Sequence, residues 1–333
     1  MSKSIYTSIS SFSKEFVDLD YRDLEKARNS RKWLVSKIEE FPYMDDSFPK
    51  LYPGENDVQM GSFRRHTKIR PIDDIDFIIV FNAAGSTYSS NYGDDSLKIN
   101  VPKSSDRLHL LTNDDSTLNS IKLVNQLKKS LSTVSHYENA EIKRNKEAVT
   151  LKLKSYSWNF DIVPAFLTAS DVEGRSYYLI PDGSGNWKKT DPRIDSKRVT
   201  EVNKKRNGEV LKYIRLIKYW NKRSRTPSIG SYLLENLVLN YFDVYDLSPT
   251  NQSTLRDIFK HLSTAIYSVC PDPKKIQGDL NDLDSDTKMK FSNAAKTAYI
   301  SANKAVSHSI EQDHKMAHVE WKKIFGEDFP NYE

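Results

Sequence analysis

Residues 61–81 read GSFRRHTKIRPIDDIDFIIVF and carry the strongest indication of the fold in this chain. Its second half, residues 74–81, is rich in β-branched and aromatic side chains and predicts a β-strand. Side chains in a strand point to alternate faces, so Asp74 and Asp76 lie on the same face. Two neighbouring carboxylates repel each other unless a cation lies between them. The pair is therefore a favourable binding site for a hard divalent ion such as Mg²⁺.

A third carboxylate, Asp161, lies within the apolar run YSWNFDIV at residues 156–163. A charge in a strand otherwise fit for burial is costly unless it is paired or bound to a metal. Three carboxylates on adjacent strands would suit a site for two metals, one activating an attacking hydroxyl and the other holding a triphosphate. Gly61 lets the backbone approach a phosphate closely, and Ser62 adds a hydroxyl and an amide donor.

Each of these signals also has a structural interpretation when it is taken alone. A Gly-Ser pair is usually a turn, an Asp-x-Asp sequence is usually a solvated face or a helix cap, and Asp161 could pair with an unidentified arginine. The combination is more specific than any one signal, because the three occur in a defined order and spacing and a predicted strand follows the Asp-x-Asp sequence.

Composition excludes several classes of protein. The 333 residues contain 50 Lys and Arg against 45 Asp and Glu, for a net charge of +5, and the length fits one large domain or two closely packed ones. The single cysteine, Cys270, excludes a disulfide framework and a multi-cysteine zinc module. Because no apolar stretch approaches the ~20 residues of a membrane span and no signal peptide is visible, we expect a cytoplasmic protein without a membrane partner.

The remaining patterns predict a mixed α/β half followed by an all-helical half, with a cleft between them. In the first half we expect helices at 20–41 and 117–134, antiparallel strands at 147–154 and 156–163 with the second ended by Pro164, an irregular segment at 42–60 and a long loop at 82–115. In the second half we expect helices at 196–222, 229–245, 252–268, 285–306 and 309–324.

Positive charge is concentrated at residues 193–225, which hold twelve Lys or Arg and three acids, for a local charge of +9. Arg215, Lys218 and Lys222 recur on one face of the helix expected there. A cationic face of this kind suits a triphosphate and its leaving pyrophosphate. Charge alone favours the alternatives, a solvated basic face or a nucleic-acid patch.

The sequence of residues 61–81 resembles the signature of the DNA polymerase β-like nucleotidyltransferases, in which Gly-Ser is followed by Asp-x-Asp at the start of a strand and by a distant third Asp. Within them it is most similar to the branch of 2′-5′ oligoadenylate synthetase, cyclic GMP–AMP synthase and the bacterial CD-NTases. That branch commonly has a Gly-Thr pair where this chain has His66 and Thr67. The ending HVEWKKIFGEDFP, residues 318–330, also resembles bacterial CD-NTases.

The resemblance implies an α+β fold of two lobes, a mixed β-sheet palm followed by a C-terminal helical lobe. The domains expected from it are an N-terminal helix at residues 1–40 that bridges both lobes, a palm at 41–194 and a helical lobe at 195–333.

The resemblance also implies the catalytic residues. Asp74, Asp76 and Asp161 are expected to bind two Mg²⁺ ions, with Mn²⁺ as an alternative, and Asp73 replaces a ligand if the register is wrong. Asp161 would bind the metal next to the attacking hydroxyl, and no separate histidine base is needed.

Nucleotide contacts are expected from Gly61 and Ser62 and from two helices of the second half. YIRLIKYWN at 213–221 and SIGSYLLENLVL at 228–239 resemble the family's lysine helix and serine-tyrosine helix. By that match Lys218 and Ser231 contact the triphosphate and Tyr232 stacks on the base. The alternatives are a helix N-terminal residue for Ser231 and core packing for Tyr232.

The implied activity is synthesis of a cyclic di- or trinucleotide second messenger from ribonucleoside triphosphates, ATP and GTP among them, with release of pyrophosphate. The bacterial members imply a role in anti-phage signalling through a downstream effector. Three alternatives stay open: extension of RNA or tRNA ends, nucleotidyl transfer to a protein or small molecule, and a non-enzymatic scaffold. Retention of three carboxylates argues against the scaffold, and a nucleic-acid partner is not favoured.

Overall fold

The computed structural model describes residues 4–90, 96–223 and 228–332. The chain divides into two compact units, each described here by itself. We call Met1–Leu19, Arg65–Arg70 and Ile194–Glu333 the helical unit, and Asp20–Arg64 and Pro71–Arg193 the sheet unit. The region predicted as one N-terminal helix at residues 1–40 contains a helical segment at 5–17, in the helical unit, and the start of a second helix at Tyr21, in the sheet unit. The predicted bridging of two lobes by this region stays a prediction.

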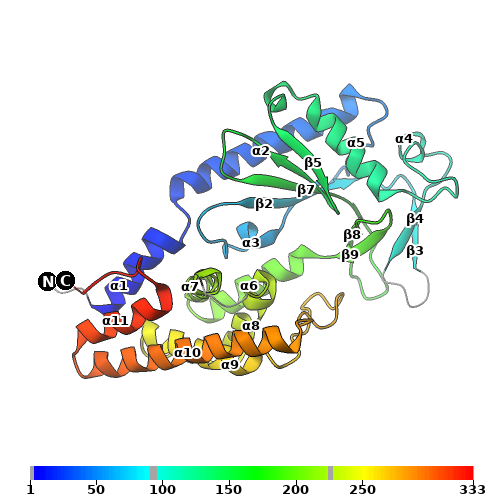
Figure 1. The fold of residues 1–333 in the computed structure, drawn as a ribbon. Coiled ribbons are helices and arrows are strands. Elements are labelled where there is room, and N and C mark those ends of the chain that lie inside the picture. The colour runs from blue at the N-terminus through cyan, green and yellow to red at the C-terminus, as the bar shows by residue number, and fades with distance from the viewer. Residues whose placement is uncertain (1–3, 91–95, 224–227, 333) are drawn as a thin grey trace. The chain divides into compact units, whose positions relative to one another are not determined.

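The sheet unit is built on a mixed sheet whose strands run in the order β1-β2-β7-β8-β9-β4-β3, with β6 and then β5 attached to β7 (Figure 1). Only β2 and β7 pair in parallel among the described strands, and the other pairings are antiparallel. The strand bounds are β1 Asp57–Gln59, β2 Asp74–Phe81, β3 Thr87–Ser90, β4 Leu97–Asn100, β5 Glu141–Asn145, β6 Ala148–Lys152, β7 Asn159–Leu167, β8 Tyr178–Pro181 and β9 Trp187–Thr190.

The helices of the sheet unit are α2 Tyr21–Met44, α3 Gly61–Arg64, α4 Asp106–His109, α5 Ser120–Ser132 and the short 3₁₀ turn η2 Ser135–Tyr137. α2 and α5 lie along one face of the sheet, and α3 lies on the opposite side, next to β2 (Figure 1). α5 packs against β5, β6, β7 and β8. The Arg31 guanidinium on α2 lies over the ring of Phe77 on β2, 5.2 Å from its centroid.

Alternation along β2 decides which face of the sheet carries the carboxylates. Phe77, an odd-numbered residue, is buried on the face that α2 approaches. Ile78 and Val80, the even-numbered residues, are buried in a separate apolar cluster with Val163 of β7. Because β2 side chains alternate, the even-numbered aspartates at its start belong to this second face.

The helical unit buries one apolar core. Its elements are α1 Ile5–Phe12, the π-helix η1 Ser13–Val17, α6 Pro192–Lys205, α7 Val210–Arg223, α8 Ser231–Val244, α9 Asn251–Ala265, α10 Ser285–Ile310 and α11 His314–Phe325. The ring of Trp220 lies 5.1 Å from Phe259 and 5.7 Å from Phe291, both in edge contact. The ring of Phe12 on α1 lies 5.1 Å from Tyr219 on α7 and 5.1 Å from Phe325 on α11. These contacts join α1, α7, α9, α10 and α11 into one unit.

The structure confirms the predicted mixed sheet, the helical second half and the strand at 74–81. It also confirms the helix at 20–41 and the antiparallel pairing of the two strands before residue 165, since β6 pairs with β7 in that sense. No helix within the described residues has both the length and the apolarity that crossing a membrane requires.

The prediction that Pro164 ends a strand was wrong, because Pro164 lies inside β7 and pairs with Ile79 of β2. On the opposite edge of β7, the ladder with β6 ends at Ile162 and the ladder with β8 resumes at Phe166. Pro164 thus falls where this edge has no strand partner, a position that tolerates a residue without an N–H.

The single helix predicted at 196–222 is two helices, α6 and α7. Asn207 and Gly208 have φ values of 54° and 82° between them, and the Gly208 N–H donates to the Asn203 carbonyl oxygen at 2.8 Å. An Asn-Gly pair in the left-handed region is a common helix end, so the sequence contained a signal for this break.

The prediction of a long loop at 82–115 was also partly wrong, since this segment contains β3, β4 and α4.

The aromatic cluster around Trp220 generates a prediction about stability. Replacing Phe259, which is fully buried, with alanine should lower the free energy of unfolding by about 3–5 kcal/mol, because the truncation removes apolar contacts and leaves a cavity. Urea denaturation followed by tryptophan fluorescence measures the change. Val244→Ala, at an exposed site, is the control and should change stability by less than about 0.5 kcal/mol; an equally small loss for Phe259→Ala would contradict the packing described.

Candidate active site

The parallel register of β2 and β7 brings the three predicted carboxylates together. Asp76 is paired with Asp161, and Asp74 with Asn159. One carboxylate oxygen from each of Asp74, Asp76 and Asp161 lies within 4.8 Å of the others, and all three residues are half-buried. We call these three residues the carboxylate triad. Its oxygen-only donor set is the kind that Mg²⁺ and Mn²⁺ prefer, so the residues present fit a divalent ion.

Neighbouring groups orient the triad. Thr150, which pairs with Asp161 across the antiparallel β6–β7 ladder, donates its hydroxyl to Asp161 Oδ1 at 2.5 Å. Sequence reasoning missed Thr150, since a threonine in a strand carries no signal until its cross-strand partner is known. Asp73 is not part of the triad, and its side chain accepts the Asp74 N–H at 3.0 Å.

Gly61 lies against the triad for a steric reason. It is the first residue of α3 and has φ of 71°, and a Cβ placed on it would clash with Asp76 Oδ2. The Met60 N–H also donates to the Asp76 carbonyl oxygen at 3.2 Å. The absence of a side chain at Gly61 therefore makes room for the Asp76 carboxylate. Ser62 follows and is half-buried, and its predicted contact with a phosphate stays a prediction.

Lys218, predicted to contact a triphosphate, is buried in the helical unit and fully hydrogen-bonded. Its Nζ donates to Glu235 Oε2 at 2.7 Å and to the carbonyl and hydroxyl oxygens of Thr67 at 3.2 Å each. An ammonium group has three N–H donors, so these three acceptors match its capacity. The predicted role of Lys218 stays a prediction, and in this structure the side chain ties α7 to α8 and to residue 67.

Glu235 is the centre of this buried cluster and was missed by sequence reasoning. Burial opposes its ionisation, but the charges of Lys218 and Arg65 outweigh burial and lower the pKa of Glu235 to about 2. Arg65 Nε donates to Glu235 Oε1 at 2.6 Å, and Thr67 donates its hydroxyl to Oε2 at 2.7 Å. The signal in the sequence was an acid within the apolar run SYLLENLVL, which is costly to bury unless it is paired.

Ser231 and Tyr232 begin α8. Ser231 is the first residue of the helix and is exposed, after the N-cap Gly230. Tyr232 is half-buried, and its hydroxyl donates to Asp195 Oδ1 at 2.6 Å. The structure thus places the serine at a helix N-terminus and the tyrosine in a polar network, and their nucleotide contacts stay predictions.

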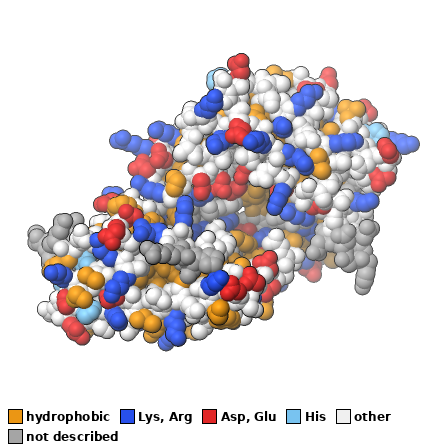
Figure 2. Space-filling view, viewed as in Figure 1, with side chains coloured by type: hydrophobic (Ala, Val, Ile, Leu, Met, Phe, Trp, Pro, Cys, Tyr) orange, Lys and Arg blue, Asp and Glu red, His pale blue; other side chains and the backbone are white. Residues whose placement is uncertain are grey.

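The basic stretch 193–225 is largely neutralised by nearby acids. Eight of its described cations are in ion pairs, namely Arg193, Lys197, Arg198, Arg206, Lys212, Arg215, Lys218 and Arg223. Arg225 lies outside the described residues. On the face seen in Figure 2, blue and red side chains are interspersed. Most of the described cations of this stretch therefore have an acidic partner, and the predicted contact of its cationic face with a triphosphate stays a prediction.

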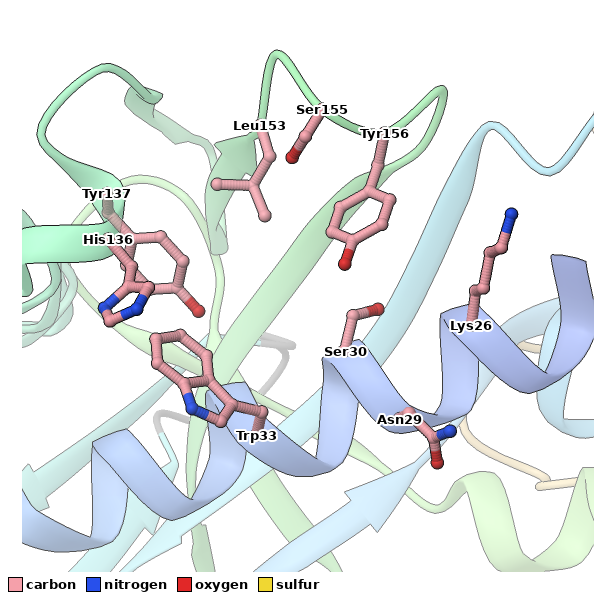
Figure 3. A pocket seen from close by; sticks show the side chains of 9 residues that line it. All are labelled: Lys26, Asn29, Ser30, Trp33, His136, Tyr137, Leu153, Ser155 and Tyr156. Atoms are coloured by element: carbon pink, nitrogen blue, oxygen red, sulfur yellow. The ribbon is translucent and has the colours of Figure 1, made fainter.

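An aromatic pocket of about 460 Å³ lies in the sheet unit between α2, η2 and the β6–β7 connection (Figure 3). Its lining residues are Lys26, Asn29, Ser30, Trp33, His136, Tyr137, Leu153, Ser155 and Tyr156. None of the predicted site residues lines it.

The buried cluster predicts a pH-dependent stability. Glu235→Gln should lower the free energy of unfolding by about 3–5 kcal/mol at pH 7, because it leaves two buried cations without their counter-ion. The folded-state pKa of Glu235 is lowered, so its contribution is present above the ordinary carboxyl pKa and is lost as the pH falls from about 4.5 towards 2. The stability difference between wild type and variant should narrow over that range in urea titrations.

The control for this experiment is Glu201→Gln, which removes an exposed carboxylate 3.9 Å from Lys197. It should change stability by less than about 1 kcal/mol. A Glu235→Gln protein as stable as wild type at pH 7 would show that the buried cluster does not hold the helical unit together.

Comparison with known proteins identifies the family. Residues 103–203 match the SMODS family, the Second Messenger Oligonucleotide or Dinucleotide Synthetase domain, a range that contains Asp161 of the triad. A probable cyclic nucleotide synthase of Bacillus cereus is 49% identical over 333 residues, all of both chains. A cyclic AMP-AMP-AMP synthase of Acinetobacter sp. is 27% identical over 195 residues, 56% of this chain and 54% of that protein.

Among solved structures, E. coli MS115-1 CdnC with ATP has a TM-score of 0.70 at 17% identity, over 98% of this chain and 99% of that one, a likeness of fold. The relationship to the Bacillus cereus protein covers the whole chain and includes both the strand that opens with Asp74 and the helix that carries Glu235. The chain therefore belongs to the bacterial CD-NTases, nucleotidyltransferases that synthesise cyclic nucleotides.

Proposed function

We propose that this enzyme joins ribonucleoside triphosphates, ATP among them, into a cyclic di- or trinucleotide. In each step a ribose hydroxyl attacks the α-phosphate of a triphosphate, and pyrophosphate leaves. The observation that carries the proposal is the convergence of the carboxylate triad on one face of the sheet. ATP is proposed because CdnC was solved with ATP and the Acinetobacter relative makes a product of AMP units.

The triad is proposed to hold two Mg²⁺ ions, with Mn²⁺ as a substitute. Asp74 and Asp76 would bind both ions, and Asp161 would bind the one next to the attacking hydroxyl. When bound, the ions lower the pKa of that hydroxyl and neutralise charge on the triphosphate. The Thr150 hydrogen bond holds one oxygen of Asp161 in place and so fixes the direction of the other.

The helical unit is proposed to supply nucleotide contacts, with Lys218 and Ser231 at the triphosphate and Tyr232 at the base. Gly61 and Ser62 would contact the phosphates from the sheet unit. Lys218 already has three acceptors, so contact with a phosphate requires it to exchange one of them. Exposed Ser231 needs no such exchange.

The product is proposed to act as a second messenger in the cytoplasm, read by a downstream effector in anti-phage defence. Extension of RNA ends is the weaker alternative, because most described cations of the 193–225 stretch are already in ion pairs. RNA binding would rely on cations that are available to phosphates.

The proposed reaction is tested by incubating the protein with the four ribonucleoside triphosphates and Mg²⁺, with and without added RNA. We expect a phosphatase-resistant product that contains AMP, identified by mass spectrometry, together with pyrophosphate. Asp74→Asn combined with Asp76→Asn should lower pyrophosphate release at least ~10³-fold, since metal binding supplies several kcal/mol of transition-state stabilisation.

Asp73→Asn is the matched control, because it makes the same chemical change next to the triad and should keep activity within a few-fold. Binding of Mn²⁺, followed by electron paramagnetic resonance, should be lost in the double variant and kept in Asp73→Asn. A product that phosphatase degrades would contradict cyclisation, and extended RNA would favour the alternative. Full activity of the double variant would place the metal ligands elsewhere.

The steric role of Gly61 gives a second prediction. Gly61→Ala should lower turnover about 10²-fold and weaken Mn²⁺ binding, because its Cβ displaces the Asp76 carboxylate. Gly174→Ala is the control, since Gly174 has a similar φ of 76° but no atom within 4 Å of the added Cβ. It tests backbone strain without the clash. Equal losses in both variants would show that strain, and not the contact with Asp76, accounts for the effect.

A further inference from the structure

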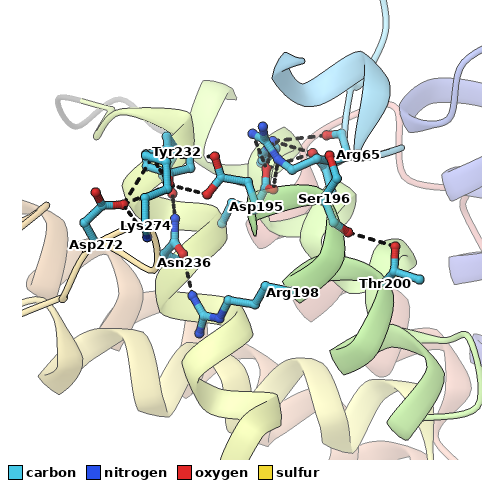
Figure 4. A network of polar contacts seen from close by, with 12 residues as sticks. Arg65, Asp195, Ser196, Arg198, Thr200, Tyr232, Asn236, Asp272 and Lys274 are labelled. Atoms are coloured by element: carbon cyan, nitrogen blue, oxygen red, sulfur yellow. Dashed lines mark hydrogen bonds and ion pairs between the residues drawn. The ribbon is translucent and has the colours of Figure 1, made fainter. Parts of the chain in front are cut away.

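A buried polar network surrounds the hydroxyl of Tyr232 in the helical unit (Figure 4). Its members come from separate elements: Asp195 from α6, Tyr232 from the first turn of α8, and Asp272 and Lys274 from the connection between α9 and α10. The side chains of Asp195 and Lys274 are 9% and 7% exposed, and that of Asp272 is fully buried. We call these four residues the tyrosine network.

Lys274 and Asp195 hold the hydroxyl from two sides. The hydroxyl donates to Asp195 Oδ1 at 2.6 Å and accepts from Lys274 Nζ at 2.6 Å. Lys274 Nζ is also 3.1 Å from Asp272 Oδ1 and 3.5 Å from Asp195 Oδ2. Because the tyrosine has both a charged acceptor and a charged donor, its hydroxyl has one favourable position.

A folded loop presents Lys274 to the hydroxyl. The carboxylate of Asp272 accepts the backbone N–H groups of Lys274, Ile276 and Gln277 at 3.0–3.2 Å. The Asp272 N–H itself donates to the Gly278 carbonyl oxygen at 2.8 Å. Asp272 thus shapes the loop and neutralises the lysine, so the Lys274 ammonium is held in place before any ligand binds.

The ring of Tyr232 is restrained as well as its hydroxyl. The Arg65 guanidinium lies over the ring, 5.5 Å from its centroid, and is itself held by Glu235. Lys274 Nζ also lies over the ring, 4.4 Å from its centroid, while it donates to the hydroxyl oxygen. Two cations at the ring and the hydrogen bonds at the hydroxyl therefore restrain the orientation of the Tyr232 side chain together.

A tyrosine that serves core packing alone does not need this arrangement. Burying a lysine with two aspartates is costly, and apolar side chains of similar size usually stabilise a protein as well or better. What the network provides is a fixed orientation for one aromatic ring. We infer that Lys274 is a positioning residue that holds the Tyr232 ring for stacking on the purine or pyrimidine base of the nucleotide, an inference that rests on the proposed function.

The inference is tested with Lys274→Met and Tyr232→Phe, singly and combined, in pyrophosphate-release kinetics. Each single variant should raise the nucleotide KM about tenfold and change kcat less than about threefold, because a charge-assisted hydrogen bond is lost while the triad is untouched. The double variant should raise KM no further than either single variant, since both remove the same contact. Lys274→Arg should restore KM to within about threefold of wild type.

Two comparisons separate the possible failures. Lys275→Met, an exposed neighbour in the same loop, is the matched control and should leave KM and kcat unchanged. Tyr232→Phe keeps every charge of the network. It therefore shows whether the hydrogen bonds of the Tyr232 hydroxyl set the nucleotide KM even if Lys274→Met does not fold. Additive effects on KM, or a fall in kcat without a rise in KM, would overturn the inference. A wild-type protein without pyrophosphate release would contradict the proposed function itself.

Discussion

The parallel pairing of β2 with β7 is the constraint on which the candidate chemistry depends. It sets Asp76 opposite Asp161, while alternation along β2 puts Asp74 on the same face as Asp76. A shift of one residue in this register would turn Asp161 to the other face, among the aromatic side chains. The apolar residues that follow in both strands oppose such a shift, because it would expose them. The apolar residues that pack the sheet therefore also hold the three aspartates of the triad in place.

The helical unit contains buried charges of both signs. Glu235, Lys218 and Arg65 all have buried side chains, and the two cations are tolerated because each is paired with the Glu235 carboxylate. Tyr232 connects this cluster to the tyrosine network, since Arg65 lies over its ring. Polar groups buried at this density restrict the side chains to one arrangement. Such rigidity suits the recognition of a planar base and a triphosphate that we propose for this unit.

Much of the fold followed from local patterns. The strand that starts at Asp74 and most helices after residue 195 appeared where their periodicity indicated. Two of the errors came where a non-local contact outweighed a local rule, and one came from a local signal that was overlooked. Pro164 stays in β7 because its edge of the strand has no partner there, and the break at Asn207 and Gly208 was an overlooked helix-end signal. The short strands between residues 82 and 115 owe their existence to pairing with each other and with β9.

Local pattern was enough to show that Asp74 and Asp76 share a face, because a strand repeats every two residues wherever it lies. It was also enough to indicate the third aspartate, since a charge in an apolar run needs a partner. The folded chain was needed to show that Thr150 orients Asp161, that Gly61 makes room for Asp76 and that Lys218 is paired with Glu235. These contacts join residues far apart in the chain, and an ion pair or a close approach depends on which elements the fold brings together.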